Sequence, residues 1–336
     1  MTDNVVHTAP SSTPGLRRPR HLVVRVAGSA LRKIASAVAV LFAATTLVFF
    51  SLQLAPGNVI DVIVGDAASD VSREEAAAEW GLDRPLYEQY ANYLLRLAKG
   101  DLGHSYILAQ PVTKVIGDRI GPTIELTFCA AVIAITVAVT VIVLTGTGTP
   151  RASHISSLIE LVLVSTPGFW LGIILMFVVS FHLGLLPVVG SNSFLVVLLP
   201  ATTLGLKIAG ELIQIMRGAV NRALQEPFAL SAKARGISDI GFSLRHGLRH
   251  AALPAITVAG WVVGTLLTGT FVIEQLFGRS GIGTLTVKAV LSRDMPVVMG
   301  VSLLAAAIYV VVNTIVDILY TLIDPRLRHT ADSGRE

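Results

Sequence analysis

The chain has 336 residues, of which 53% are hydrophobic and 14% are charged, and its mean hydropathy is +0.70. This composition excludes a water-soluble globule for most of the chain and indicates a membrane protein. A single cysteine, Cys129, excludes a disulfide framework or a cysteine metal site within the chain. The formal net charge of +4 is small, and in a membrane protein the placement of basic residues matters more than their sum, so nucleic acid is not an expected partner.

Residues 1–33 are rich in Pro, Ser, Thr and Arg and predict a flexible basic tail. The apolar run 34–54 that follows is long enough to cross a membrane. A cleaved signal peptide shows the same basic-then-apolar order. However, the run has about 21 residues and no A-x-A site at its end, so we expect a retained helix.

Residues 55–118 hold more acidic than basic side chains and therefore belong in water. The order Ser-Arg-Glu-Glu at 72–75 predicts a helix cap. An apolar stripe then predicts a second helix that ends near Gly100; its members are Leu86, Tyr90, Tyr93, Leu94 and Leu97. We expect a helical insertion between the first two spans, acting either as a folded lid or as a docking surface.

Five further apolar runs predict spans at 124–145, 158–181, 194–216, 255–273 and 297–322. The fold class is thus an all-α polytopic membrane protein with six transmembrane helices. If the N-terminus lies inside, the inner side carries 16 Lys and Arg residues and the outer side 9, most of these in one long loop. This bias predicts that both termini, including a tail at 326–336, face the cytoplasm.

A polar island at 226–254 lies between the fourth and fifth spans and must lie outside the lipid. It predicts two short helices that meet at Gly236, the second capped by Ser238. The apolar positions Ile240, Leu244 and Leu248 of that second helix repeat every four residues, and the bent pair of helices has a shape that suits docking into a groove on another protein. Small Ala232 beside Gly236 would let a partner approach closely. An amphipathic loop on the lipid headgroups is the alternative.

Four polar residues lie inside predicted spans, where an isolated charge costs about 2.5 to 3.5 kcal/mol. Lys207 and Glu211 are four residues apart and are expected to pair or to face water. Asn313 and Asp317 have the same spacing and are expected to bridge helices. For both pairs, a position along a transport pathway stays open. Two GxxxG patterns, at 168–172 and 260–264, suggest close helix approach.

The order Glu226, Ala232, Gly236 and Leu253-Pro254 resembles the EAA loop of ABC-importer permeases. The whole chain from about 34 to 327 is similar to their branch for dipeptides, oligopeptides, nickel and related chelates. The other matching pieces are Leu54-Ala-Pro-Gly57, Gly81 to Tyr87 with Gln89-Tyr90, Gly100 to Ser105, Glu274 to Gly283, Arg293 to Pro296 and Asp324 to Leu327. Phe228 departs from the family, where a tyrosine is common, and Gln214 lies where an arginine is frequent.

The resemblance implies a permease subunit that forms half of a translocation pathway, with residues 119–325 as its transmembrane domain. It implies these ATPase-coupling residues: Glu226, Phe228, Ala232, Lys233, Arg235, Gly236, Leu253 and Pro254. The implied partners are a second related permease, two ATPase subunits, an extracytoplasmic solute-binding protein that the insertion would dock, and membrane lipid. The chain itself would bind no cofactor, since ATP and Mg²⁺ belong to the ATPases. Peptide, nickel and metallophore all stay open as substrates.

Rival chemistries have weaker support. The chain lacks the GxxxxGK[ST] pattern of a phosphate-binding loop, so ATP chemistry must come from a partner. Gly278-Arg-Ser-Gly281 formally fits a serine-protease pattern with His182 as base, and His246 with His250 has a possible zinc spacing without a carboxylate set. An ion-coupled secondary transporter would be expected to show inverted repeats, which are not evident here. We therefore expect no enzyme.

Overall fold

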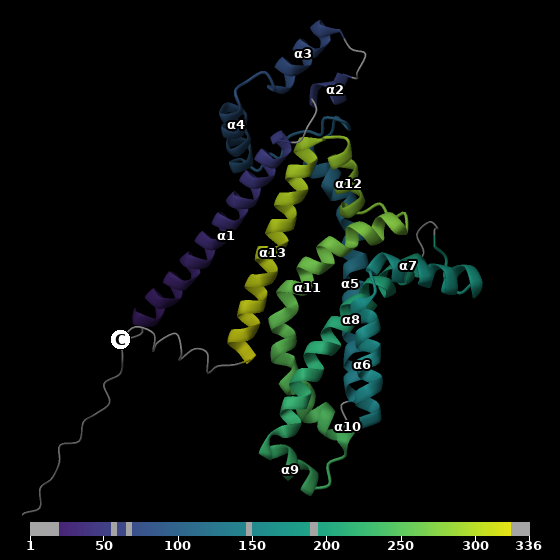
Figure 1. The fold of residues 1–336 in the computed structure, drawn as a ribbon. Helices are drawn as coiled ribbons and strands as arrows, with labels where there is room; N and C mark the ends of the chain where they lie inside the picture. Colours follow the sequence, from purple (N-terminus) through teal and green to yellow (C-terminus); the bar gives the residue numbers. More distant parts are fainter. Residues whose placement is uncertain (1–19, 55–58, 65–68, 146–149, 189–193, 324–336) are drawn as a thin grey trace, which may run out of the picture.

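The computed structural model describes residues 20–54, 59–64, 69–145, 150–188 and 194–323. Within these ranges the regular structure is helical, apart from one isolated bridge between His104 and Pro111. Figure 1 shows long helices side by side, short helices beyond their upper ends, and a helical hairpin at the lower tip. The predicted all-α class is confirmed.

Four described helices are long and apolar enough to cross a membrane. They are residues 31–54 of α1 (Arg20–Leu54), α5 (Val112–Thr145), α8 (Phe194–Gln225) and residues 295–319 of α13 (Met295–Ile323). They contain the first, second, fourth and sixth predicted spans. Helix α5 begins before the predicted span and takes in Pro122, so part of the segment assigned to water is the first turns of a long helix.

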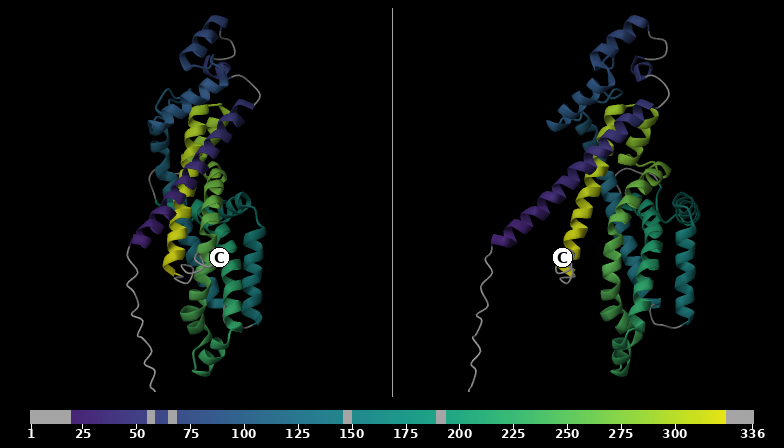
Figure 2. Two further views of the ribbon diagram at one scale, coloured as in Figure 1. Left: turned by 90° about the vertical axis from the view of Figure 1, so that its left-hand side faces the viewer. Right: turned by 60° about the vertical axis from the view of Figure 1, so that its left-hand side comes forward.

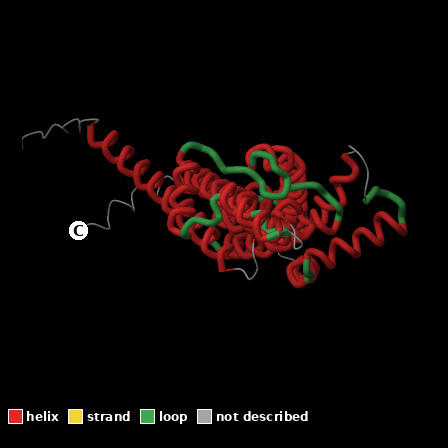
Figure 3. Tube along the Cα trace, turned by 90° about the horizontal axis from the view of Figure 1, so that it is seen from above, coloured by secondary structure: helices red, strands yellow, loops and turns green. Residues whose placement is uncertain are grey.

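The third predicted span, 158–181, is wrong as one straight helix. α6 (Pro150–Ser165) is followed by α7 (Gly168–Leu175) and the π-helical segment η1 (Met176–His182), bent away by 104°. The break falls at Pro167, which lacks an N–H and disfavours helical geometry in the residue before it. Seen from above, the arm formed by α7 and η1 leaves the bundle on the side opposite to the start of α1 (Figure 3).

The fifth predicted span, 255–273, lies within α11 (Leu248–Leu276), a helix of 29 residues. Several of its side chains lie outside the described residues. The count of six spans therefore stays a prediction.

The core of the bundle lies between α5 and α8. Ala130, Ala134 and Ala138 follow one another every four residues on α5 and are at most 1% exposed. Gly205 of α8 lies so close that a Cβ there would be 2.8 Å from the carbonyl oxygen of Ala130. These small side chains let the two backbones approach each other.

Of the four glycines in the two predicted GxxxG patterns, Gly172 is confirmed as a point of close helix approach. A Cβ at Gly172 would lie 2.6 Å from a methyl carbon of Leu276, so α7 packs tightly against the end of α11. A Cβ at Gly168 or Gly264 would meet nothing within 4 Å. The side-chain environment of Gly260 lies outside the described residues.

The insertion between α1 and α5 contains α2 (Val59–Val64), α3 (Asp70–Trp80) and α4 (Leu86–Ala98). α2 and α3 lie beyond the upper end of α13 in the side views, whereas α4 lies beside the upper end of α1 (Figures 1 and 2). The predicted stripe on α4 is confirmed from Tyr90 to Leu97, since these residues pack in one cluster with Phe49 of α1, whereas Leu86 is 47% exposed. The cap of α3 is Ser69, one turn before the predicted position, because its hydroxyl accepts from the N–H of Ser72 at 3.2 Å.

Candidate functional site

The polar island at 226–254 is a helical hairpin at the lower tip of Figure 1. Its first helix, α9 (Pro227–Ala234), ends before Gly236, whose φ of +77° is a conformation that L side chains rarely adopt. Two N–H groups just beyond α9 donate to the carbonyl oxygen of Ala232 and close the last turn. The predicted short helix ending at a glycine is confirmed.

The second half of the hairpin starts at Ser238, as predicted. Its hydroxyl accepts from the N–H of Gly241 at 3.2 Å and caps α10 (Asp239–Phe242). The chain then continues through the π-helical turn η2 (Ser243–Gly247) directly into α11. A displacement of the hairpin would therefore reach α11 without an intervening loop.

The predicted second helix is not one unbroken α-helix, and its apolar row does not form the part of the hairpin that packs inside. Ile240 and Leu244 are 47% and 54% exposed, whereas Phe242 is only 1% exposed. The prediction assumed an unbroken α-helical period, and the wider turn of η2 interrupts that period.

The interior of the hairpin is an aromatic stack. The ring of Phe228 lies between Phe242, with centroids 6.0 Å apart, and His250, with centroids 5.2 Å apart. Ala229 and Ala232 are each 1% exposed and pack in the same cluster. Ala232 thus serves the internal packing of the hairpin. The expectation that it meets a partner directly is corrected.

The outer surface of the hairpin is partly apolar. Leu230 is 74% exposed and, with Ile240 and Leu244, presents side chains that the chain itself does not cover. Glu226 and Arg235 are exposed beside them. The side chains of three other predicted residues, Lys233, His246 and Leu253, lie outside the described residues, and Pro254 falls inside α11.

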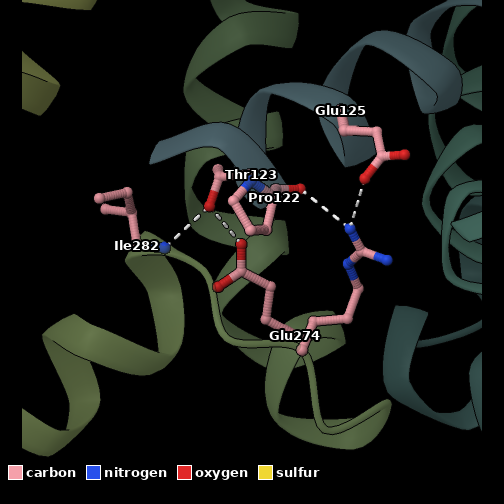
Figure 4. A network of polar contacts seen from close by, with 6 residues as sticks. Pro122, Thr123, Glu125, Glu274 and Ile282 are labelled. Atoms are coloured by element: carbon pink, nitrogen blue, oxygen red, sulfur yellow. Dashed lines mark hydrogen bonds and ion pairs between the residues drawn. The ribbon is translucent and has the colours of Figure 1, made fainter. Parts of the chain in front are cut away.

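A buried polar cluster links α5 to the end of α11, near the opposite end of the bundle. The carboxylate of Glu274, which is 0% exposed, accepts from the hydroxyl of Thr123 at 2.6 Å and from the N–H of Thr284 at 3.1 Å. The Thr123 hydroxyl oxygen accepts from the N–H of Ile282 at 2.8 Å (Figure 4). Because the first N–H groups of a helix have no intrahelical partner, these side chains cap α12 (Ile282–Leu291) and hold it on α5.

The loop before α12 lies directly on this cluster. A Cβ at Gly281 would overlap the carboxylate of Glu274. Arg279 donates to the carbonyl oxygen of Pro122 at 3.2 Å and pairs with Glu125 at 3.0 Å (Figure 4). This stretch carries part of the family resemblance, but its role in a buried cluster was not predicted. The sequence pattern that could have indicated it is the carboxylate of Glu274 at the end of an apolar run, followed by the closely spaced glycines Gly278, Gly281 and Gly283.

A second buried carboxylate joins the insertion to α13. Asp294, 3% exposed, accepts from the hydroxyl of Ser105 and from the N–H of Tyr106 at 3.1 Å. Ser105 and Asp294 belong to two of the stretches that carry the resemblance, Gly100 to Ser105 and Arg293 to Pro296. Their contact across 189 positions was not predicted.

Lys207 lies where α8 passes the break after α6. Its ammonium group donates to the carbonyl oxygen of Val164 at 2.5 Å and is 3.5 Å from that of Leu163. These carbonyls belong to the last turn of α6, where the helix supplies no N–H groups to pair with them. Among the described residues, no ion pair joins Lys207 to Glu211, so the expected pairing of these two residues is not observed. One carboxylate oxygen of Glu211 is buried without a hydrogen-bond partner.

Asp317 pairs with Lys33 of α1 at 3.0 Å, with both side chains about half exposed. Asn313 donates to the carbonyl oxygen of Tyr309 in its own helix at 3.0 Å. Asp317 therefore joins two helices, as the bridging interpretation predicted. A role of these residues along a pathway stays a prediction.

Comparison with known proteins identifies the family. Residues 138–329 match the inner membrane component of binding-protein-dependent transport systems, and residues 28–127 match the N-terminal part of such membrane components. The chain belongs to this family. It is 35% identical over 310 residues to a putative peptide transport system permease protein of Brucella abortus (strain 2308). It is 33% identical over 300 residues to the glutathione transport system permease protein GsiC of Escherichia coli (strain K12). Each match covers 89% of this chain and 98% of the relative.

This membership makes the chain a multi-pass membrane permease subunit of an ABC importer and not an enzyme. It implies an ATPase and a solute-binding protein as partners. The predicted family and role are confirmed, and the protease and ion-coupled transporter alternatives are set aside.

Proposed function

We propose that this permease forms half of a translocation pathway whose other half is a second, homologous permease. Two ATPase subunits bind ATP and Mg²⁺ and drive the cycle, while this chain binds no cofactor. The absence of a GxxxxGK[ST] sequence supports this division of labour.

In the proposed orientation both termini and the hairpin of α9 and α10 lie in the cytoplasm, and α2 to α4 lie outside. The excess of Lys and Arg on the inner segments supports this direction. The hairpin and the insertion also lie at opposite ends of the molecule (Figure 1), as two sides of one membrane require.

The observation that carries the proposal is the exposed apolar surface of Leu230, Ile240 and Leu244 over a filled aromatic interior. Burying a leucine or isoleucine fully contributes about 1.5 to 3 kcal/mol. Because Leu230, Ile240 and Leu244 are 74%, 47% and 54% exposed, burying what remains of them in an ATPase groove would contribute about 3 to 5 kcal/mol. A shift from 1:99 to 99:1 between two states takes about 5.5 kcal/mol, so ATP-dependent docking of this surface would supply a large part of it.

The hairpin is connected so that docking would move two spans together. α8 ends at Gln225, and α9 begins at Pro227, two positions later. On the other side, η2 continues into α11. A groove that carries the hairpin would therefore carry the lower ends of α8 and α11, and so alternate the pathway between inward- and outward-open states.

The proposed substrates are peptides or a related small solute, such as a nickel or other metal chelate. The names of the relatives, a peptide permease and a glutathione permease, support the peptide class. The solute-binding protein would make most of the selection.

The test uses the complete importer in lipid vesicles. Leu230→Asp and Leu244→Asp, both at exposed positions, should reduce ATP-dependent uptake at least about tenfold and leave the unfolding temperature of the chain unchanged, because the charge opposes burial in the groove. Asn221→Asp adds the same charge at an exposed position at the end of α8 and should transport like the unmodified protein. Unchanged uptake in both leucine variants would refute docking through this surface.

A further inference from the structure

A cavity of about 460 Å³ lies among α3, α4, the loop after α4, and the adjoining ends of α1 and α13. Its volume falls in the range of about 300 to 1,000 Å³ that is typical of ligand pockets. Arg84 and Lys99 line it and are exposed, so the cavity is open to solvent. It is separate from the hairpin and from the cluster around Glu274, and it adjoins the cluster around Asp294, because Tyr106 belongs to both.

Tyr93, one of the residues that line this cavity, carries a hydrogen-bond donor that the chain does not use. The residue is 6% exposed, and its ring packs on Phe49 with centroids 6.4 Å apart. Its hydroxyl is buried and has no hydrogen-bond partner. A buried polar group without a partner is unfavourable, and a ligand that accepts this hydrogen bond would recover that cost.

The charge of Arg96 acts on the phenols of Tyr93 and Tyr106, and all three residues line the cavity. Burial raises the pKa of both tyrosines, to about 12 for Tyr106, and the positive charge of Arg96 acts on both in the opposite direction. Both phenols therefore stay protonated donors at neutral pH. Arg96 forms no ion pair with another described residue, so its guanidinium keeps its donors for a ligand.

The residues that line the cavity favour an organic anion, in which a negatively charged group is attached to an apolar part. Besides Arg96, the cations Arg84 and Lys99 line the cavity against one acid, Glu79. A guanidinium matches the two oxygens of a carboxylate, and the phenols can add further donors. Trp80, whose ring meets that of Tyr106 edge-on at 4.9 Å, supplies an apolar wall that an inorganic anion would not use.

We propose that this cavity binds the carboxylate of a small organic solute, such as the C-terminal carboxylate of a short peptide, between Arg96 and the hydroxyls of Tyr93 and Tyr106. The proposal rests on the proposed orientation, which places α3 and α4 outside the cytoplasm. The permease would then have its own recognition site for solute beside the mouth of the bundle.

The experiment is calorimetric titration of the purified full-length chain in detergent with trialanine and with trialanine amide, which lacks the carboxylate. We expect saturable binding of the acid and at least tenfold weaker binding of the amide. Tyr93→Phe and Arg96→Gln should each weaken binding of the acid about tenfold, because each removes a donor to a charged group. The unfolding temperature of Tyr93→Phe should not fall, since the hydroxyl that it removes has no partner in the chain.

Two matched controls are available. Tyr87→Phe removes a hydroxyl from an exposed tyrosine of α4, and Arg119→Gln removes a half-buried guanidinium from α5; neither residue lines the cavity. Both variants should bind trialanine like the unmodified chain.

Equal binding of acid and amide, no binding of either, or full binding by both pocket variants would overturn the proposal. If a solute-binding protein binds the chain through Arg96 while trialanine does not bind, the carboxylate is a protein side chain and the small-solute proposal fails. ATP-driven uptake that persists without trialanine binding would leave the proposed transport function standing and reject only this site.

Discussion

The carboxylate of Glu274 accepts a hydrogen bond from the hydroxyl of Thr123 at 2.6 Å, although 151 positions separate the two residues. The same two side chains receive N–H groups from the first turn of α12. Helices α5, α11 and α12 are thereby joined at one buried point. Removing any one of these hydrogen-bonding groups would leave a buried donor or acceptor without a partner and would lower the stability of the fold.

Gly281→Ala should therefore destabilise the chain strongly. Its Cβ would overlap the Glu274 carboxylate and displace it from Thr123, and overpacking of this kind costs about 1 to 3 kcal/mol. The measurement is the unfolding temperature of the purified chain in detergent at one heating rate. Gly168→Ala is the control, because a Cβ there meets no atom within 4 Å. Equal unfolding temperatures for the two variants would contradict the described packing.

Lys207→Met should loosen the end of α6. Without the ammonium group, the carbonyls of Val164 and Leu163 lose their donor at the break, so local opening becomes easier by about 1 kcal/mol. Hydrogen exchange of a fragment covering 158–166 should accelerate about fivefold. Glu211→Gln should leave this exchange unchanged. A similar acceleration in both variants would instead favour a Lys207–Glu211 pair.

Gly236→Val should impair coupling through the geometry of the backbone. A φ of +77° is strained by about 1 to 2 kcal/mol for most L residues, and more for a β-branched one, so the end of α9 should shift. We expect ATP hydrolysis by the complete importer to continue while uptake falls several-fold. Gly236→Asn is the matched variant, since asparagine tolerates positive φ, and it should retain most uptake. If valine and asparagine behave alike, the conformation of Gly236 does not control coupling.

Stability should fall in strong alkali because of Tyr106. Burial raises its pKa from 10.0 to about 12, so the folded chain holds this proton more tightly than the unfolded chain does. The resulting stability is fully present below pH 10 and is lost as the pH rises toward about 12, by about 2 to 3 kcal/mol. Denaturant titrations at pH values of about 9 and 11.5 should show this loss. Tyr106→Phe should reduce the pH dependence, and Tyr87→Phe should not.

Much of the local structure could be predicted because it depends on neighbours in the chain. The stripe on α4, the end of α9 at Gly236 and the cap at Ser238 follow from side-chain spacing and from the backbone freedom of glycine. The four-residue spacing of Ile240, Leu244 and Leu248 indicated one unbroken second helix, which a π-helical turn interrupts. The straight third span failed at Pro167, a breaker that the hydropathy of the run concealed.

By itself the sequence determined that this is a helical membrane protein with a lipid-excluded hairpin between two spans, because apolar run lengths and polar interruptions are local properties. Only the tertiary structure decided that Glu274 meets Thr123, that Asp294 meets Ser105, and that Lys207 turns to the carbonyls of α6. A buried polar group must find a partner, but which partner it finds depends on how the helices pack, and no spacing along the chain encodes that choice.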